Sequence, residues 1–361
     1  MEDRALRKIL LIQAIEETDP SGEALPLAER IEATRTVMGN NPPNIEPQAG
    51  APLSSATEWF LIRRADVLID SLRARSPGID HVLDVAGGAT SLDRGLLVVA
   101  FALGASLSFF DAAHGGINIF APPLLALLVW NLLVYVFLGV RSSRVRIEST
   151  ASNAANSEAL RESFVQPSGF GRFYARWVRR HIERLLGHST RFNAPLAPGL
   201  RRFAGDWLEI AQPLFFARAR RLLHLSAVFA ALGLVTGYYF RGFVLRSAAG
   251  WEGGGAIGPE TAHALLSVLY GPASLLSGIT VPGADAMAAL RWSAPSLSGV
   301  GEPAIWVHLI ALTAGLYIIL PRLILTVLSA LRLWRMSRRL ALPPLVVGYL
   351  QTLVTSARSA A

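Results

Sequence analysis

The chain has 361 residues, of which 52% are hydrophobic and 17% are charged. A soluble domain carries about 25% charged residues, and the mean hydropathy of +0.40 reflects long apolar runs. An ordinary soluble protein, a disordered chain and a collagen-like repeat are therefore excluded. Because the sequence contains no Cys, disulfides, thiolate metal sites and cysteine nucleophiles are excluded as well.

The net charge of +8 does not predict a nucleic-acid partner. Every basic residue except Lys8 is Arg, and these residues gather in particular loops. The sequence has no zinc-finger spacing, RNA-recognition signature or basic-aromatic platform. We therefore expect no nucleic acid among the partners.

Residues 1–91 are predicted to form a helical region in the cytosol. Apolar residues recur at helical spacing in 4–17, 27–38 and 58–75, whereas 40–52 is rich in Pro and Asn and predicts a loop. The first residues lack the basic start and apolar stretch of a secretory signal. We therefore expect this region to remain on the cytosolic side.

Four apolar runs predict membrane-spanning helices, at about 95–112, 117–140, 222–244 and 304–331. A helix needs about 20 residues to cross the hydrocarbon core of a bilayer. The first run is the shortest and ends near Asp111. The predicted fold is therefore all-α: an integral membrane four-helix bundle with helical cytosolic segments and a partly helical outer loop.

The distribution of Arg predicts the orientation of these helices, because basic residues are retained on the cytoplasmic side. Residues 141–221 contain 15 Arg, whereas 111–116 contain none and 245–303 contain two. The first two helices then form a hairpin over 92–140. Both termini, the basic helical region 141–221 and the tail 332–361 are predicted to be cytosolic, and 245–303 is predicted to be a folded periplasmic loop.

Small residues predict close helix packing in lipid. Pairs four positions apart occur in three of the runs: Gly233 and Gly237, Ala100 and Gly104, and Ala311 and Gly315. Aromatic residues lie in or near the ends of the runs, where several suit anchoring at the headgroup level. They are Trp130, Tyr135, Tyr238, Tyr239, Trp251 and Trp306.

Two water-facing segments have patterns of their own. Residues 170–185 combine aromatic residues with Arg, which we interpret as packing on the inner leaflet, with a protein partner as the alternative. In the outer loop, helices are predicted over 261–270, ending at Gly271-Pro272, and over 284–292. The glycine run 253–258 matches a dinucleotide-loop spacing, but no predicted strand precedes it, so we interpret it as a glycine-rich turn.

Polar residues in or beside the apolar runs are candidate functional or structural sites, because charges in lipid are costly. Arg322 follows Pro321 inside the fourth run and either reaches inner-leaflet phosphate or faces the bundle at a hinge or pathway. Arg241 is either an interface arginine or a partner of Glu252 or Glu302.

Further candidates come from the same runs. Asn131 is suited to hydrogen bonding across helices, and His308 reads more readily as a packed histidine than as a ligand. The candidate set is Asn131, Arg241, Trp251, Glu252, Glu302, His308 and Arg322. The sequence shows no nucleophile motif, metal-binding motif or pair of carboxylates in a run. We expect no catalytic, metal or cofactor site, and no enzyme.

Several stretches resemble a bacterial membrane family that is catalogued as domain of unknown function 2868. They are QAIEETD at 13–19, PPLL at 122–125, WNLLVY at 130–135, GLVTGYYFRG at 233–242, AGWE at 249–252, GPAS at 271–274, GE at 301–302, WVH at 306–308 and LPR at 320–322. Members are typically encoded beside a predicted cytoplasmic GTPase. The resemblance therefore implies a location in the bacterial inner membrane and a GTPase partner.

The sequence is compatible with two functions. The first is a non-enzymatic membrane platform or regulatory partner of a cytosolic GTPase. The alternative is a small oligomeric channel or transporter with Arg322 and Asn131 along its pathway. The lipid bilayer is an expected partner in both cases, and homo-oligomerisation is left open.

Overall fold

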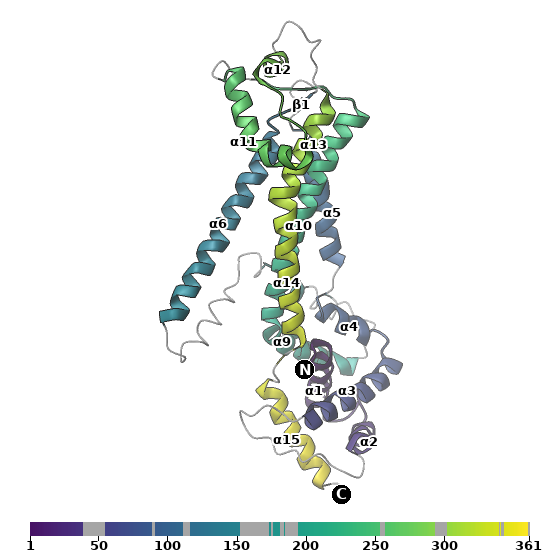
Figure 1. Cartoon of the computed structure of the whole chain (residues 1–361). Coiled ribbons are helices and arrows are strands. Elements are labelled where there is room, and N and C mark those ends of the chain that lie inside the picture. Colours follow the sequence, from purple (N-terminus) through teal and green to yellow (C-terminus); the bar gives the residue numbers. More distant parts are fainter. Residues whose placement is uncertain are drawn as a thin grey trace. The chain divides into compact units, whose positions relative to one another are not determined.

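The computed structural model describes residues 1–38, 55–88, 91–110, 116–151, 173–174, 176–180, 184, 194–252, 257–292, 302–338, 340 and 343–359. Within these ranges the chain is almost entirely helical, with one short parallel sheet (Figure 1). The predicted helical class is confirmed. The loop predicted at 40–52 and most of the glycine run 253–258 lie outside the described residues.

The chain divides into two compact units. Unit 1 comprises residues 1–90, 165–220 and 329–361, and unit 2 comprises residues 91–164 and 221–328.

Unit 1 consists mainly of short helices around α1. They are α1 (Asp3–Thr18), α2 (Leu27–Met38), α3 (Ser55–Arg75), α4 (Ile79–Ala86), α9 (Ala197–Ile210) and α15 (Pro344–Ser359). The helices predicted at 4–17, 27–38 and 58–75 are present as α1, α2 and α3, whereas α4 was not predicted. Helix α1 is buried on most sides, as expected for a helix that other helices surround.

Contacts from distant parts of the sequence hold unit 1 together. The indole Nε1 of Trp207 in α9 donates to the carbonyl of Ala86 at the end of α4, at 2.8 Å. The Gln13 amide of α1 donates to the carbonyl of Leu345 in α15 at 3.1 Å. Gly199 lies so close to Ile15 that a side chain at this position would clash with the α1 backbone. The N-terminal, middle and C-terminal segments therefore share one core.

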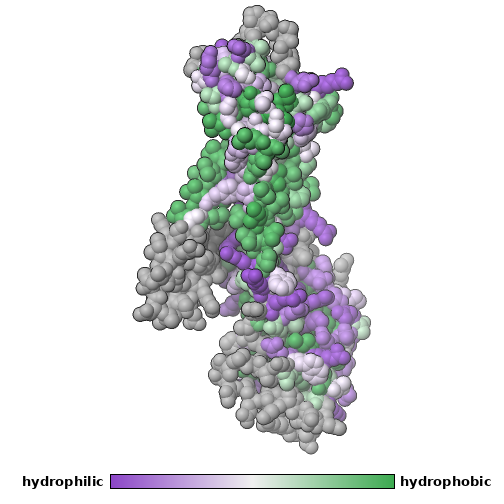
Figure 2. All heavy atoms as spheres, viewed as in Figure 1, coloured by the Kyte–Doolittle hydropathy of each residue, from purple (hydrophilic) through white to green (hydrophobic). Residues whose placement is uncertain are grey.

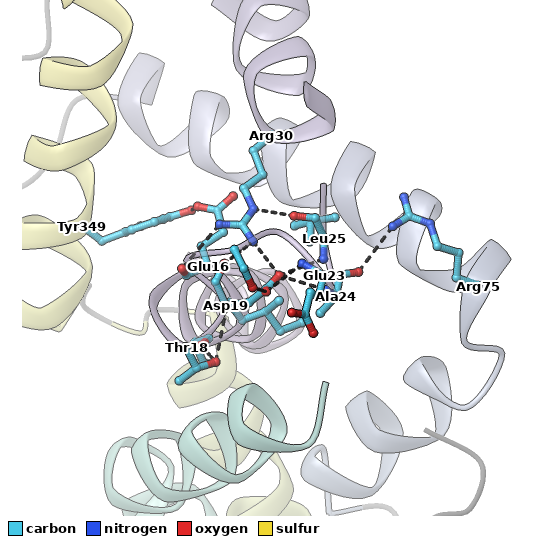
Figure 3. A network of polar contacts seen from close by, with 12 residues as sticks. Glu16, Thr18, Asp19, Glu23, Ala24, Leu25, Arg30, Arg75 and Tyr349 are labelled. Atoms are coloured by element: carbon cyan, nitrogen blue, oxygen red, sulfur yellow. Dashed lines mark hydrogen bonds and ion pairs between the residues drawn. The ribbon is translucent and has the colours of Figure 1, made fainter. Parts of the chain in front are cut away.

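Asp19 orders the turn between α1 and α2 (Figure 3). Its carboxylate accepts backbone N–H bonds from Glu23, Ala24 and Leu25 at 2.9–3.0 Å, and Arg30 donates to it at 2.7 Å. Burial by itself would raise the pKa of Asp19, but the three N–H donors and the Arg30 charge outweigh it and hold the pKa below its ordinary value of 3.8. Asp19 therefore stays ionised and fixes the turn.

Arg64 of α3 joins three other helices of unit 1. Its guanidinium donates to Glu16 of α1 at 2.6 Å, to the Tyr349 hydroxyl of α15 at 2.5 Å and to Thr34 of α2 at 2.8 Å. The Tyr349 hydroxyl donates in turn to Glu16 at 2.5 Å (Figure 3). Burial and the neighbouring Glu16 carboxylate raise the pKa of Tyr349 well above its ordinary value, against the opposing Arg64 charge. Tyr349 therefore remains a hydrogen-bond donor.

Unit 2 contains the long apolar helices. They are α5 (Ser91–Leu107), α6 (Pro122–Ala151), α10 (Gln212–Tyr239) with its π-helical turn η3 (Phe240–Val244), and α13 (Pro303–Ala314), which continues through the π-helical turn η5 (Gly315–Ile319) into α14 (Leu320–Arg338). The first residues of α10 and the last of α14 belong to unit 1. Figure 2 shows hydrophobic residues over most of the visible face of these helices.

Three helices are long and apolar enough to cross a membrane: Pro122–Val140, Gln212–Val244 and Pro303–Arg338. They overlap the second, third and fourth predicted spans. The first predicted span, ~95–112, corresponds to α5, a helix of 17 residues. At 1.5 Å per residue α5 is about 26 Å long, short of the ~30 Å hydrocarbon core. That α5 is a fourth membrane-spanning helix therefore stays a prediction.

The structure corrects three predicted element boundaries. Ile117 does not begin a helix, because β1 (Ile117–Asn118) pairs in parallel with β2 (Ala249–Gly250) and α6 starts only at Pro122. The helix predicted to end at Gly271-Pro272 continues as α11 (Pro259–Ser277) and ends at Gly278, whose φ of 72° closes it. Helix α12 covers Ala284–Ala289, so it ends before the predicted residue 292.

Small residues bring α5 and α10 together. A Cβ atom on Gly104 would clash with the backbone of Ala230, and one on Gly233 would clash with the backbone of Phe101. Gly237 lies equally close to Ser108. These glycines let the two backbones touch, as the small-residue spacing predicted. Gly315, by contrast, faces open space.

Replacing Gly233 by Leu is expected to force α5 and α10 apart. Overpacking of this kind costs about 1–3 kcal/mol and lowers the melting temperature of the detergent-solubilised protein. Gly139→Ala in α6 is the matched control, because nothing lies within 4 Å of a Cβ at that position. Equal melting temperatures for the two variants would contradict the close contact.

Asp19→Asn is expected to destabilise the intact protein at pH 7 by about 1–3 kcal/mol, the cost of losing charged hydrogen bonds. Because the folded state lowers the pKa of Asp19, its stabilisation is complete above the ordinary value and is lost as pH falls through the folded value. Melting curves of both proteins between pH 7 and 3 measure this difference, which should shrink only at acid pH. Glu32→Gln is the control, since the exposed Glu32–Arg35 pair contributes little.

Candidate functional site

Arg322 lies at the centre of a buried polar cluster in unit 2. Its Nε donates to the Asn131 side-chain oxygen in α6 at 2.6 Å, and its Nη1 donates to His224 Nδ1 in α10 at 3.1 Å. All three side chains are buried. The ring of Tyr135 lies 5.5 Å from the guanidinium carbon, within the range of a cation–π contact. We call Asn131, Tyr135, His224 and Arg322 the Arg322 cluster.

The proline before Arg322 explains another contact of the cluster. Pro321 has no N–H, so it cannot donate to the carbonyl of Tyr317 four residues earlier. The Tyr135 hydroxyl of α6 donates to that carbonyl at 3.2 Å. A neighbouring helix thus supplies the donor that the helix itself lacks, which is how apolar surroundings tolerate proline.

The hydrogen bonds define the chemical state of the cluster. Arginine has donors only, so in this contact His224 Nδ1 is the acceptor. Asn131 donates to the Leu127 carbonyl of its own helix at 2.7 Å, which leaves its oxygen free to accept from Arg322. Within the described ranges no carboxylate pairs with Arg322. Neutral acceptors and an aromatic ring therefore surround its charge.

The cluster settles the direction in which Arg322 points. Its side chain faces Asn131 and His224 and is 5% exposed, so it does not reach towards lipid phosphate. The arrangement joins α6, α10 and α14 at one point and suits a positional lock between helices. Sequence reasoning named Arg322 and Asn131 and considered Tyr135 as an interfacial aromatic, but it gave no role to His224, which lies about 90 residues or more from the other three in the chain.

Arg241 is the second buried arginine of unit 2 and lies in η3. Its side chain is 1% exposed and donates to the backbone carbonyls of Ser108 and Gly116. The Phe109 ring lies 5.8 Å away. Arg241 therefore fastens the end of α5 to the beginning of β1. Its burial differs from the interpretation of Arg241 as an interface arginine, whereas a partnership with Glu252 or Glu302 stays a prediction.

Trp251 organises the cap of unit 2, which we define as β1, β2, α11 and α12. Its indole Nε1 donates to the Met287 carbonyl at 2.8 Å, and the Arg291 guanidinium lies 4.9 Å from its ring. Trp251 and Trp306 are both buried, so they pack within the protein and do not anchor at the headgroup level. Burial is favourable for Trp251 because its N–H has a protein acceptor.

The remaining candidates are two exposed glutamates and a half-buried histidine that contacts one tyrosine hydroxyl. Glu252 and Glu302 are exposed, and Glu302 immediately precedes α13. His308 is half-buried, and its Nδ1 lies 2.8 Å from the Tyr239 hydroxyl. No group of three potential metal-ligating side chains occurs in the part of the chain that was described. Among the seven candidates, the described hydrogen bonds bring together Asn131 and Arg322.

Replacing Asn131 by Leu is expected to leave Arg322 Nε without its acceptor in a buried position. Loss of a hydrogen bond to a charged group costs about 1.5–3 kcal/mol, which thermal unfolding in detergent would measure. Arg322→Leu and the double variant complete a mutant cycle, and contact between the two residues predicts that their effects are not additive. Leu133→Ala, on the exposed side of α6, is the control. Strict additivity would contradict the lock.

Comparisons with known proteins add no further assignment to these residues. No family model, no curated protein and no solved structure matches the chain. The roles given to Arg322, Arg241 and Trp251 therefore rest on their geometry.

Proposed function

We propose that this chain is a four-span protein of the bacterial inner membrane that acts as a non-enzymatic platform for a cytosolic GTPase. In this proposal unit 2 crosses the membrane and unit 1 is the cytosolic platform. Both termini are cytosolic, as the Arg-rich composition of 141–221 favours.

Unit 1 is built from three separate segments of the chain, which supports an even number of membrane crossings between one segment and the next. Residues 1–90, 165–220 and 329–361 pack in one compact body, and a bilayer cannot pass between parts of one packed core. The chain must therefore return to the same side between 90 and 165. In this proposal α6 makes one of these crossings and α5 makes the other.

The surface of α5 supports the same conclusion. Val98, Val99 and Leu103 are 67%, 52% and 61% exposed, whereas Gly104 contacts the backbone of α10. An apolar outer face and a small-residue inner face are typical of a helix between lipid and other helices. Bilayers accommodate a short helix by local thinning, so the length of α5 is compatible with a crossing.

The exposed stripe of α3 carries the proposal of a partner. Its inner residues, such as Phe60, Leu68 and Leu72, are buried, whereas Trp59 is 58% exposed and Val67 37% exposed. Arg63 lies exposed between them, one helical turn from each. Trp and Arg dominate the binding energy of many protein interfaces. We call Trp59, Arg63 and Val67 the α3 stripe and propose it as the docking surface.

The nature of the partner comes from the resemblance in the sequence, whose family members typically have a GTPase gene as a neighbour. The Arg322 cluster also favours a platform over the alternative of a channel. Two of the guanidinium nitrogens of Arg322 are bound to side chains of α6 and α10, which suits a lock between helices better than a site that exchanges ions.

Trp59→Ala in the intact protein is expected to reduce binding of the neighbouring GTPase at least tenfold, because a hot-spot Trp contributes about 2 kcal/mol or more. Purified protein in nanodiscs and GTPase loaded with GDP or a GTP analogue would be measured by biolayer interferometry. Trp334→Ala removes another exposed Trp of unit 1, 52% exposed, and should leave binding unchanged.

Two results would count against this proposal. The absence of GTPase binding in both nucleotide states would contradict the platform itself. Equal losses in the Trp59 and Trp334 variants would contradict the α3 stripe as the docking surface, since the effect would then not be specific to that face.

A further inference from the structure

Helix α11 in the cap has two different apolar faces. Its inner face carries Ala262, Leu266, Tyr270 and Ala273 at helical spacing, and all four are buried. Its outer face carries Leu265, Val268, Leu275 and Leu276, which are 50%, 80%, 88% and 68% exposed. An amphipathic helix in water would carry polar residues on its outer face. After Glu260 in the first turn, however, α11 has no charged residue.

The contacts of α11 show which of its parts lies near the apolar helices. Close to its beginning, His263 Nδ1 lies 2.9 Å from the Pro282 carbonyl, next to α12. In its middle, the Tyr270 hydroxyl donates to the Ile119 carbonyl at 2.7 Å, three residues before α6 begins. The Tyr270 ring also packs edge-on against Trp306 in the first turn of α13. The second half of α11 therefore continues beside the ends of two membrane-spanning candidates.

The most exposed apolar side chains, Leu275 and Leu276, belong to this second half. They follow the point where Tyr270 meets the ends of α6 and α13. Pro272 also lies in this half and cannot donate to the Val268 carbonyl four residues earlier. Water at the headgroup level can bind such a carbonyl, whereas the hydrocarbon centre cannot. These features suit a shallow position at the membrane surface.

We infer that α11 is an interfacial helix whose outer face, Leu265, Val268, Leu275 and Leu276, binds the acyl chains of the leaflet on the side of the cap. The apolar surface of unit 2 is thereby continuous from the spanning helices onto α11. This inference rests on the membrane insertion of unit 2 under the proposed function, but it is independent of GTPase binding. Its occupant is lipid, because the face is apolar, uncharged and adjacent to the span ends.

The absence of Cys from the chain makes site-directed spin labelling the direct test. Val268→Cys and Leu275→Cys would be labelled with a nitroxide in the full-length protein in lipid nanodiscs. Leu133→Cys, at an exposed position in the middle of α6, is the lipid reference. Ala288→Cys, at an exposed position of α12, is the water reference. Collisions with oxygen report lipid, and collisions with a nickel chelate report water.

At 268 and 275 we expect oxygen accessibility close to that at 133 and nickel accessibility at least threefold lower than at 288. The calculated depth should be smaller than at 133. Nickel accessibility equal to that at 288 would overturn the inference, because the face would then be in water. Low accessibility to both reagents would overturn it too, because another protein surface would then cover the face.

The reference label separates this inference from the larger proposal. If position 133 is itself accessible to the nickel chelate, α6 does not cross the bilayer, and both the membrane insertion and the lipid contact of α11 are wrong. If 133 reports lipid while 268 and 275 report water, only the inference about α11 fails. All four positions are exposed, so labels there do not disturb the core.

Discussion

A charged side chain that is buried among apolar helices is costly unless polar atoms of the protein hydrogen-bond to it. This constraint decides the arrangement of unit 2. Arg322 and Arg241 each carry a charge and several donors into the buried interior, and each is met by oxygen or nitrogen atoms from other segments. The helices are consequently fixed where these acceptors meet, and close packing of glycines completes the contact elsewhere.

Arg241 and Arg322 both occur beside irregular turns of their helices. Arg241 lies inside the π-helical turn η3, and Arg322 follows η5 by three residues, with Pro321 between them. A π-helical turn adds a residue to the repeat and thereby rotates the side chains that follow it. Such a turn lets a long apolar helix direct a single polar side chain inward while its neighbours still face outward. In both helices, the π-helical turn and the buried arginine therefore occur together.

The sequence predicts much of this architecture and little of its detail. Periodicity identified α1, α2 and α3, because their apolar faces are regular, and long apolar runs identified three helices that can cross a membrane. It failed where tertiary contacts override local preference. Pro272 did not end α11, whose inner face is held by the cap, and Ile117 joined a strand because Ala249 supplied the pairing partner. The site was predicted only in part, since the partners of Arg322 on α6 and α10 are joined by folding, not by spacing.

Buried arginines in the two units have different kinds of hydrogen-bond partner. In unit 1, Arg64 and Arg30 are paired with Glu16 and Asp19, because carboxylates remain ionised where water and backbone donors are near. In unit 2, the described contacts of Arg322 are made by an amide, an imidazole and an aromatic ring.

The position of Tyr349 has a consequence for the order in which the contacts of unit 1 form during synthesis. Glu16 and Arg64 emerge from the ribosome early, but the hydroxyl that links them to α15 belongs to the last part of the chain. Chains are completed from the N-terminus, and their early segments begin to fold during synthesis. The contacts of Tyr349 with Glu16 and Arg64 can therefore form only after the apolar helices described for unit 2 have been translated.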